Sequence, residues 1–225
     1  MMKREIVITK DGSPTLSIPG MQVTYHSLHG ALQESTHVFI RNGLHYALDK
    51  FRGVEINVFE MGFGTGLNAW LTAKEAATFQ RRICYTTIEQ FPLTLQDVIQ
   101  LRYAAEQDAL FMQLHEQSWN MPGWINAHFM LQKVQEDLTT FATTLTFQLI
   151  YYDAFAPAAQ PELWTEAIFR RLYDILVPDG ILVTYCAKGD VRRAMQAAGF
   201  HITKLAGPPG KREMIRAEKN CEVDH

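Results

Sequence analysis

The stretch Val58–Trp70 reads VFEMGFGTGLNAW, and it decides the expected fold. An apolar run ends at the carboxylate of Glu60, and three glycines follow at alternate positions from Gly62 to Gly66. Ordering glycine costs conformational entropy, so this cluster indicates a backbone that bends sharply or approaches a ligand closely. A strand, a glycine loop and a helix start in this order are typical of the ligand-binding turn of a doubly wound sheet.

Apolar runs alternate with amphipathic segments from residue 54 onward. The apolar runs predict strands at residues 54–60, 83–89, 128–134, 146–153, 180–186, 200–205 and 212–218. The amphipathic segments predict helices at residues 66–79, 93–104, 135–142, 161–176 and 188–199. This alternation indicates an α/β fold with a Rossmann-like, mostly parallel sheet that helices cover on both faces. The last two strands have only a Gly/Pro turn between them, which favours an antiparallel C-terminal hairpin.

Residues 1–50 precede this alternation. We interpret them as an N-terminal extension packed on the core that residues 51–225 form. The extension is expected to contain a short strand, a turn at Asp11–Gly12 and a helix that starts near Ser27.

Composition limits the classes of protein that fit. The chain has 225 residues, of which 47% are hydrophobic and 20% charged, as expected for one globular domain with an appendage. Its net charge of -3 does not favour bulk nucleic-acid binding, so such a partner needs a local basic patch. Three cysteines without a C-x-x-C pair fit a reducing compartment. Without a signal-peptide pattern or an apolar run of about 18 residues, we expect a soluble, cytoplasmic protein with no membrane partner.

Three classes of ligand use a glycine loop of this kind. A phosphate-binding P-loop ends in Gly-Lys-Ser/Thr, whereas Leu67 follows Gly66 here. The dinucleotide fingerprint is G-x-G-x-x-G, whereas the spacing here is G-x-G-x-G. The third class binds S-adenosyl-L-methionine through a motif similar to (D/E)-x-G-x-G-x-G. The residues that match or adjoin this motif, and that we expect to bind S-adenosyl-L-methionine, are Glu60, Gly62, Phe63, Gly64, Gly66 and Asn68. A plain glycine-rich turn is the alternative.

Two further carboxylates follow predicted strands. Glu89 ends the second strand, where it can accept hydrogen bonds from both ribose hydroxyls of an adenosine, the alternative being a solvated glutamate at the strand end. This feature does not separate S-adenosyl-L-methionine from NAD, because both carry that ribose. Asp137 follows the third strand, where it is expected either to accept a bond from the adenine amino group or to cap a helix.

The segment LIYYDAFAPAAQPELW (149–164) carries the candidate catalytic group. Asp153 ends an apolar strand, so it should point into the ligand crevice. A carboxylate there can orient an amine nucleophile and take up its proton during methyl transfer. Pro157 stiffens the following loop, and Phe155 and Trp164 are expected either to stack on a flat substrate or to belong to the core. For Asp153 itself, the alternative is a cap of the turn.

Several segments together resemble one known family. FEMGFGTGLNAWLT, DAFAPAAQPELW and GPPGKREMIRA resemble the methyltransferase domain of the bacterial bifunctional tRNA wobble-uridine modification enzymes, and the likeness extends over about residues 25–217. The resemblance implies a class I methyltransferase fold and methylation of 5-aminomethyl-(2-thio)uridine at tRNA position 34 to its 5-methylaminomethyl form. It also implies that the glycine loop and Glu89 hold S-adenosyl-L-methionine, and that Asp153 lies at the substrate amine.

The expected partner is therefore tRNA. In many bacteria this domain is fused to an FAD-dependent oxidoreductase, for which 225 residues leave no room, so we expect a stand-alone enzyme whose aminomethyl precursor comes from separate enzymes. Lys211 and Arg212 lie in a local basic cluster and are expected to meet tRNA phosphates, the alternative being a solvated charged edge.

Other functions stay open at this point. One is methylation of a small-molecule amine, and another is a non-catalytic module that binds S-adenosyl-L-methionine or RNA. His26 and His29 suggest a metal only weakly, because no paired cysteines or H-E-x-x-H motif accompany them, so we expect none. The sequence leaves the oligomeric state open.

Overall fold

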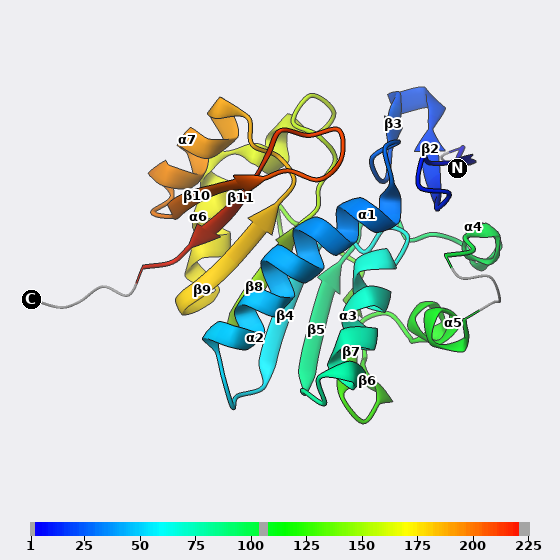
Figure 1. Ribbon diagram of the computed structural model, residues 1–225, viewed down its shortest axis with the longest axis horizontal. Helices are drawn as coiled ribbons and strands as arrows, with labels where there is room; N and C mark the ends of the chain where they lie inside the picture. The colour runs from blue at the N-terminus through cyan, green and yellow to red at the C-terminus, as the bar shows by residue number, and fades with distance from the viewer. Residues whose placement is uncertain (1–2, 104–107, 221–225) are drawn as a thin grey trace, which may run out of the picture.

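A computed structural model describes residues 3–103 and 108–220 of the chain (Figure 1). Ala104, the last residue of one predicted helix, and Cys221 lie outside the described residues. Within the described ranges, no helix is both long and apolar enough to cross a membrane.

The main sheet has eight strands in the order β10-β11-β9-β8-β4-β5-β7-β6. Their bounds are β4 (Ile56–Met61), β5 (Ile83–Ile88), β6 (Pro122–Asn126), β7 (Phe129–Val134), β8 (Phe147–Tyr152), β9 (Leu176–Thr184), β10 (His201–Ala206) and β11 (Glu213–Glu218). The central strands β7, β5, β4, β8 and β9 are parallel to one another. Strands β6, β10 and β11 pair antiparallel with their neighbours. The predicted α/β class and the antiparallel C-terminal hairpin are therefore confirmed.

Helices cover both faces of this sheet, which explains why its central strands are apolar throughout. Val58 and Leu149 belong to a core cluster shared with α3 (Leu67–Thr78) and α5 (Ala109–Glu116). Phe59 and Ile150 belong to a second cluster shared with α6 (Glu166–Asp174) and α7 (Gly189–Ala197). Successive residues of a strand point to opposite faces, so each central strand contributes to both clusters.

A long helix crosses the first of these faces, as Figure 1 shows. It consists of α1 (Ala31–Ser35), a π-helical middle η2 (Thr36–His45) and α2 (Tyr46–Lys50). It starts after Gly30 and not near Ser27, so the predicted start is four residues early. Gly43 lets the helix approach the sheet closely, because a Cβ there would lie 2.9 Å from Cγ2 of Val183.

A small sheet precedes the long helix and lies at the carboxyl-terminal side of the main sheet. It contains β1 (Glu5–Ile8), β2 (Pro14–Ile18) and β3 (Val23–Thr24), with the short helix η1 (Pro19–Met21) between the last two. The division of the chain into residues 1–50 and 51–225 stays a prediction.

Three helix predictions are corrected by the structure. Residues 135–142 form turns and not a helix, because Asp137 Oδ1 accepts hydrogen bonds from the backbone N–H and the hydroxyl of Thr139, both at 2.8 Å. The helix predicted at 161–176 is divided into η3 (Pro161–Trp164) and α6. The helix predicted at 93–104 is the shorter α4 (Leu95–Gln100). The elements that were not predicted are β2, η1, β3, α5 and β6.

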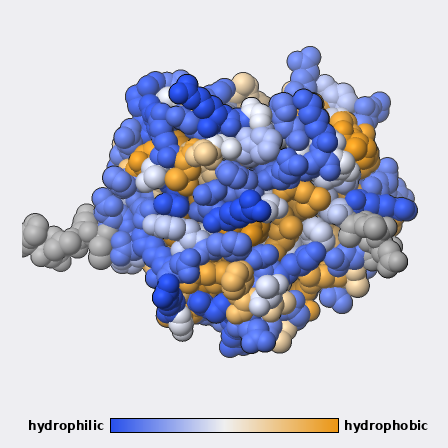
Figure 2. All heavy atoms as spheres, viewed as in Figure 1, coloured by the Kyte–Doolittle hydropathy of each residue, from blue (hydrophilic) through white to orange (hydrophobic). Residues whose placement is uncertain are grey.

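The face of the molecule seen in Figure 2 is mostly hydrophilic, and its apolar residues form separate areas between the polar ones. Single apolar side chains on a surface are normal for a globular protein. Among the described residues, this face therefore shows no large continuous apolar surface.

Candidate functional site

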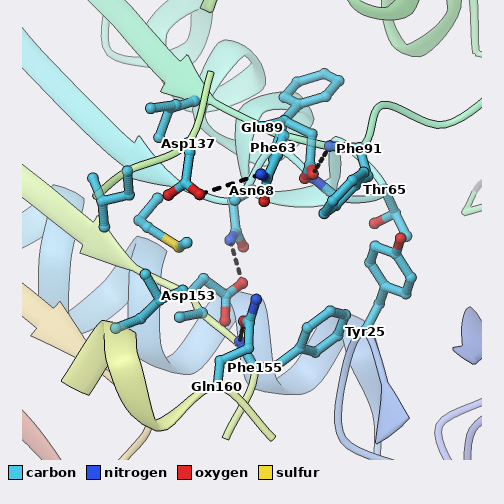
Figure 3. A pocket seen from close by; sticks show the side chains of 18 of the residues that line it. Tyr25, Phe63, Thr65, Asn68, Glu89, Phe91, Asp137, Asp153, Phe155 and Gln160 are labelled. Atoms are coloured by element: carbon cyan, nitrogen blue, oxygen red, sulfur yellow. Dashed lines mark hydrogen bonds between the residues drawn. The ribbon is translucent and has the colours of Figure 1, made fainter. Parts of the chain in front are cut away.

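A pocket opens at the carboxyl ends of β4, β5 and β8. The first parallel strand of the chain, β4, lies between β5 and β8, and later strands extend the sheet on both sides of it. The empty volume of the pocket is about 1040 Å³, including the open mouth. The glycine loop, Glu89, Asp137, Asp153 and Phe155 line it, and Tyr25 closes it from the small N-terminal sheet (Figure 3). This is the crevice in which doubly wound sheets bind ligands.

The glycine loop forms one wall of the pocket because of its backbone conformation. Gly62, Gly64 and Gly66 have φ angles of 88°, 50° and 74°, which favour glycine over any other residue. A Cβ on Gly64 would lie 3.1 Å from the ring of Tyr25, and one on Gly66 would lie 2.7 Å from Nε2 of His115. The loop therefore needs glycine for its shape and for its close neighbours.

Thr65 anchors this loop from below. Its hydroxyl accepts a hydrogen bond from the Tyr103 hydroxyl at 2.9 Å and lies 3.4 Å from Nε2 of His26. Its carbonyl oxygen lies 3.1 Å from Nε2 of His115. Burial lowers the pKa of both imidazoles to about 4, so they are neutral near pH 7. His26 thus serves as a neutral hydrogen-bonding residue between the N-terminal sheet and the loop.

Glu89 faces the pocket with both carboxylate oxygens already oriented. Oε2 accepts a hydrogen bond from the N–H of Gly64 at 3.1 Å, and Oε1 accepts one from the N–H of Phe91 at 2.8 Å. Each oxygen keeps a free lone pair, so Glu89 can accept both hydroxyls of a ribose.

Asp137 lines the pocket from the turn after β7, on the same side as Glu89 (Figure 3). Oδ1 closes the turn through Thr139, and Oδ2 accepts a hydrogen bond from Nε2 of Gln90 at 3.2 Å. The structure thus makes Asp137 a turn cap that also lines the pocket. Its contact with adenine stays a prediction.

Glu60 lies beneath the pocket and does not line it. The side chain is 1% exposed, and Oε2 has no hydrogen-bond partner among the described residues. Burial raises the pKa of this carboxyl to about 8, and the nearby charge of Asp153 adds to the effect, against the neighbouring Thr87 hydroxyl. Near pH 7 the side chain is therefore mostly a neutral acid that can itself donate a hydrogen bond.

Asp153 directly follows β8 and points into the pocket toward Asn68, which lies in the first turn of α3 (Figure 3). Nδ2 of Asn68 donates a hydrogen bond to Oδ2 at 2.9 Å, which leaves Oδ1 available to a ligand. Burial, reinforced by the carboxylate of Glu34, raises the pKa of Asp153 to about 7. A carboxyl with this pKa can accept a proton near neutral pH.

The loop after Asp153 is held by its own side chains. Oε1 of Gln160 accepts a hydrogen bond from the N–H of Phe155 at 3.1 Å, and Nε1 of Trp164 donates one to the carbonyl of Phe155 at 2.8 Å. The Phe155 ring lies 5.3 Å from the ring of Tyr25, edge to face, at the mouth of the pocket. Trp164 packs in the core behind the loop, and Pro157 does not line the pocket, so of the three substrate contacts predicted in this loop only Phe155 faces the cavity.

Lys211 and Arg212 lie outside the pocket lining. The ammonium of Lys211 contacts Oε1 of Glu34, and its side chain is 30% exposed. Arg212 is exposed in the turn between β10 and β11. Their contact with phosphates stays a prediction.

The pocket residues that sequence reasoning missed include Tyr25, Phe91 and Gln160. Phe91 follows Glu89 by two residues and was open to prediction from that spacing. Tyr25 reaches the pocket only because the small sheet folds back over the glycine loop, which no local pattern indicates.

The pocket fits S-adenosyl-L-methionine. Gly62 and Gly64 line the pocket without side chains, Glu89 presents two acceptors to a ribose, and the available volume suits a nucleoside-sized ligand. Phe91 adds an apolar surface next to Glu89.

Comparison with known proteins agrees with this fit. Residues 99–220 match the family described as S-adenosyl-L-methionine-dependent methyltransferase. The chain is 32% identical over 207 residues to the tRNA 5-methylaminomethyl-2-thiouridine biosynthesis bifunctional protein MnmC of Methylobacillus flagellatus, which covers 85% of this chain and 32% of that protein. Identity to the protein of the same name from Cupriavidus metallidurans is 33% over 230 residues, with 95% and 33% covered. The chain spans about a third of the length of these relatives, and the resemblance found in the sequence is confirmed.

Two solved structures share the fold. MNMC2 from Aquifex aeolicus has a TM-score of 0.81 at 22% identity, with 98% of this chain and 71% of that chain covered. Spermidine synthase from Thermotoga maritima has a TM-score of 0.56 at 14% identity, with 96% and 69% covered. These likenesses confirm the predicted Rossmann-like architecture.

Proposed function

Because the chain belongs to the S-adenosyl-L-methionine-dependent methyltransferases, we propose that it methylates the exocyclic amine of 5-aminomethyl-(2-thio)uridine at tRNA wobble position 34. The product is the 5-methylaminomethyl form. The relatives that are 32–33% identical to this chain over the aligned region, which is about a third of their own length, are named for the biosynthesis of that nucleoside. The observation that carries the proposal is Asp153, a carboxylate with one free oxygen beside the glycine loop.

Bound S-adenosyl-L-methionine supplies an electrophilic methyl group on a positively charged sulfur. The glycine loop and Glu89 hold the nucleoside part of this cofactor, and Asp137 closes the pocket around it. Phe155 and Tyr25 offer an apolar, aromatic mouth to a flat base. Positioning of the two reactants supplies most of the rate in a displacement of this kind.

Asp153 handles the proton of the substrate. An alkylamine is mostly protonated near pH 7 and has no lone pair to offer in that form. The free Oδ1 of Asp153 accepts an N–H of the amine and takes up the proton, while Asn68 holds the other carboxylate oxygen. An acid with a pKa of about 7 accepts this proton more readily than an ordinary aspartate, whose pKa is near 3.8.

The substrate amine must come from a preceding reaction that installs an aminomethyl group on the base. We infer that separate enzymes supply this group, and tRNA that already carries it bypasses their step in the experiment below.

Mass spectrometry of nucleosides tests the proposal. Incubation of the protein and S-adenosyl-L-methionine with tRNA that carries 5-aminomethyl-2-thiouridine is expected to convert this nucleoside to its methylamino form. The Asp153→Asn variant is expected to lose at least about 100-fold in kcat, as removal of a general base does, while its affinity for S-adenosyl-L-methionine in calorimetry is kept. Calorimetry with NAD is the control for the ligand.

Three results contradict the proposal. Methylation of free amines without methylation of tRNA indicates a small-molecule enzyme. Binding of S-adenosyl-L-methionine without turnover on any amine indicates a binding module. Full activity of Asp153→Asn removes the role given to this carboxylate.

The rate should also depend on pH. The raised pKa of Asp153, about 7, means that its carboxylate form is lost as the pH falls below that value. We therefore expect kcat to fall about tenfold per pH unit on the acidic side of pH 7. A pH–rate profile from pH 5.5 to 8.5 measures this, and a flat profile would exclude Asp153 as the proton acceptor.

A further inference from the structure

The turn between β10 and β11, residues 207–212, is tightly packed at two glycines. A Cβ on Gly207 would collide with the backbone of Lys211, and Gly210 has a φ of 85° with the ring of His29 packed against it. Both positions therefore need glycine. The turn is shaped to hold the Lys211 side chain against the body of the protein.

Lys211 reaches a buried carboxylate from this turn. Its ammonium contacts Oε1 of Glu34, which lies in α1 and is 6% exposed. The other oxygen of Glu34 accepts a hydrogen bond from the N–H of Ser27 at 2.8 Å. The ammonium also lies 3.7 Å from the centroid of the Tyr185 ring, close enough for a cation–π interaction. Lys211 is thus engaged on two sides.

Tyr185 connects this pair to the catalytic strand end. Its hydroxyl donates a hydrogen bond to the carbonyl oxygen of Ala154 at 2.8 Å. Ala154 follows Asp153 directly, so this bond holds the peptide next to the catalytic carboxylate. Contacts therefore run without a gap from α1, through the β10–β11 turn and the end of β9, to the backbone after β8.

We propose that Glu34, Lys211 and Tyr185 form a positioning cluster that fixes the orientation and the electrostatic environment of Asp153. In this assignment Lys211 acts within the fold and does not bind tRNA phosphate. The inference deepens the proposed function and rests on it only for the role of Asp153 at the substrate amine.

The charges of the pair act on Asp153 in opposite directions. Glu34 raises its pKa, and Lys211 lowers it. Three other groups interact with the charge of Asp153, namely Glu60 from β4, Tyr85 from β5 and Tyr185 itself, and burial raises the pKa of each. With these groups neutral near pH 7, the Glu34–Lys211 pair supplies the charged neighbours of the carboxylate.

Titration of Asp153 by carbon-13 NMR tests the cluster without any need for turnover. Aspartate labelled at its carboxyl carbon is introduced, and the Asp153→Asn variant identifies the signal. Lys211→Met is expected to raise the pKa of Asp153, and Glu34→Gln to lower it, each on the order of one unit. Glu34→Gln keeps an acceptor for the N–H of Ser27, and Lys211→Arg keeps the positive charge and should titrate like the wild type.

The acidic limb of the pH–rate profile should follow the same order. Lys211→Met moves it to higher pH and Glu34→Gln to lower pH, with the change in kcat and not in the KM for tRNA. Lys50→Met is the matched control, because Lys50 also pairs with a glutamate, Glu218, at 2.6 Å and lies near a tyrosine ring, but at the other end of the long helix. It should leave the titration of Asp153 unchanged.

Two outcomes overturn the proposal. One is an unchanged Asp153 titration in Lys211→Met together with a higher, salt-dependent KM for tRNA, which indicates a phosphate contact. The other is a shift of the same sign in both variants, which indicates general damage to the fold. Failure of the proposed function looks different: the NMR shifts persist while tRNA is not methylated.

Discussion

Two carboxylic acids near the pocket, Glu60 and Asp153, differ in their access to it. Glu60 is 1% exposed and does not line the pocket, whereas Asp153 lines it and is held by Asn68. Burial is the largest cause of the raised pKa in both, to about 8 and about 7. The difference lies in access, because of the two only Asp153 lines the pocket.

The position of Asp153 was open to prediction, whereas the burial of Glu60 was not. Both residues end parallel strands, and the rule that ligands bind at this edge applies to both. Glu60 shares its strand face with Val58, which packs in the cluster beneath α3. The strand alternation indicates that face, but the extent to which the glycine loop covers it depends on backbone angles that the sequence does not reveal.

Substitution of Gly64 tests the glycine loop at the scale of one residue. Gly64→Val places a branched side chain at a φ of 50°, against the Tyr25 ring at 3.1 Å. We expect affinity for S-adenosyl-L-methionine to fall at least about 100-fold, or about 2.8 kcal/mol. Calorimetry measures the affinity, and circular dichroism checks that the variant is folded. Retained affinity in a folded variant would refute the assignment of this loop to the cofactor.

At the scale of elements, the buried strands were the most predictable part of the fold. Strands β4, β5, β7 and β8 begin and end within two residues of the predicted ranges, because parallel strands covered on both faces are apolar throughout. Strand β6 was missed because it lies at the edge and its Trp124 is 50% exposed, so it lacks that pattern. Residues 135–142 were misassigned because side-chain hydrogen bonds to the backbone outweigh helical periodicity there.

The packing of the long helix depends on Gly43. A Cβ at this position would lie 2.9 Å from Val183 in β9 and 3.2 Å from the ring of Tyr151 in β8. We expect Gly43→Ala to lower the free energy of unfolding by about 1–3 kcal/mol, the usual cost of overpacking a core. Urea denaturation measures it, with Gly20→Ala as the control, since no atom lies within 4 Å of a Cβ there. A neutral or stabilising effect would show that the helix can move away from the sheet without loss.

At the scale of the whole molecule, the pocket is closed by segments far apart in the sequence. Arg4, in the N-terminal extension, donates a hydrogen bond from Nη2 to the carbonyl of Phe91 at 2.8 Å, and its Nη1 lies 3.5 Å from the Asp97 carboxylate. A contact across 87 residues leaves no local signal, which is why the N-terminal side of the pocket was not predicted. The main sheet, by contrast, follows from the order of its elements.

Removal of the Arg4 side chain tests this closure. We expect Arg4→Ala to weaken binding of S-adenosyl-L-methionine about 3- to 10-fold, because Phe91 loses its support at the mouth of the pocket, while the titration of Asp153 stays unchanged. Calorimetry measures the affinity, and Lys3→Ala serves as the control because its pair with Glu5 is exposed. An affinity equal to that of the wild type would show that the Arg4 contact does not contribute to cofactor binding.

The order of the sheet also bears on how the chain folds as it is synthesised. β11 lies between β9 and β10, although it is made after both. Until Glu213–Glu218 leaves the ribosome, β9 and β10 each expose a strand edge that β11 later covers. A ribosome that stalls shortly before this segment therefore displays an open sheet, a form prone to aggregation and a substrate for chaperones.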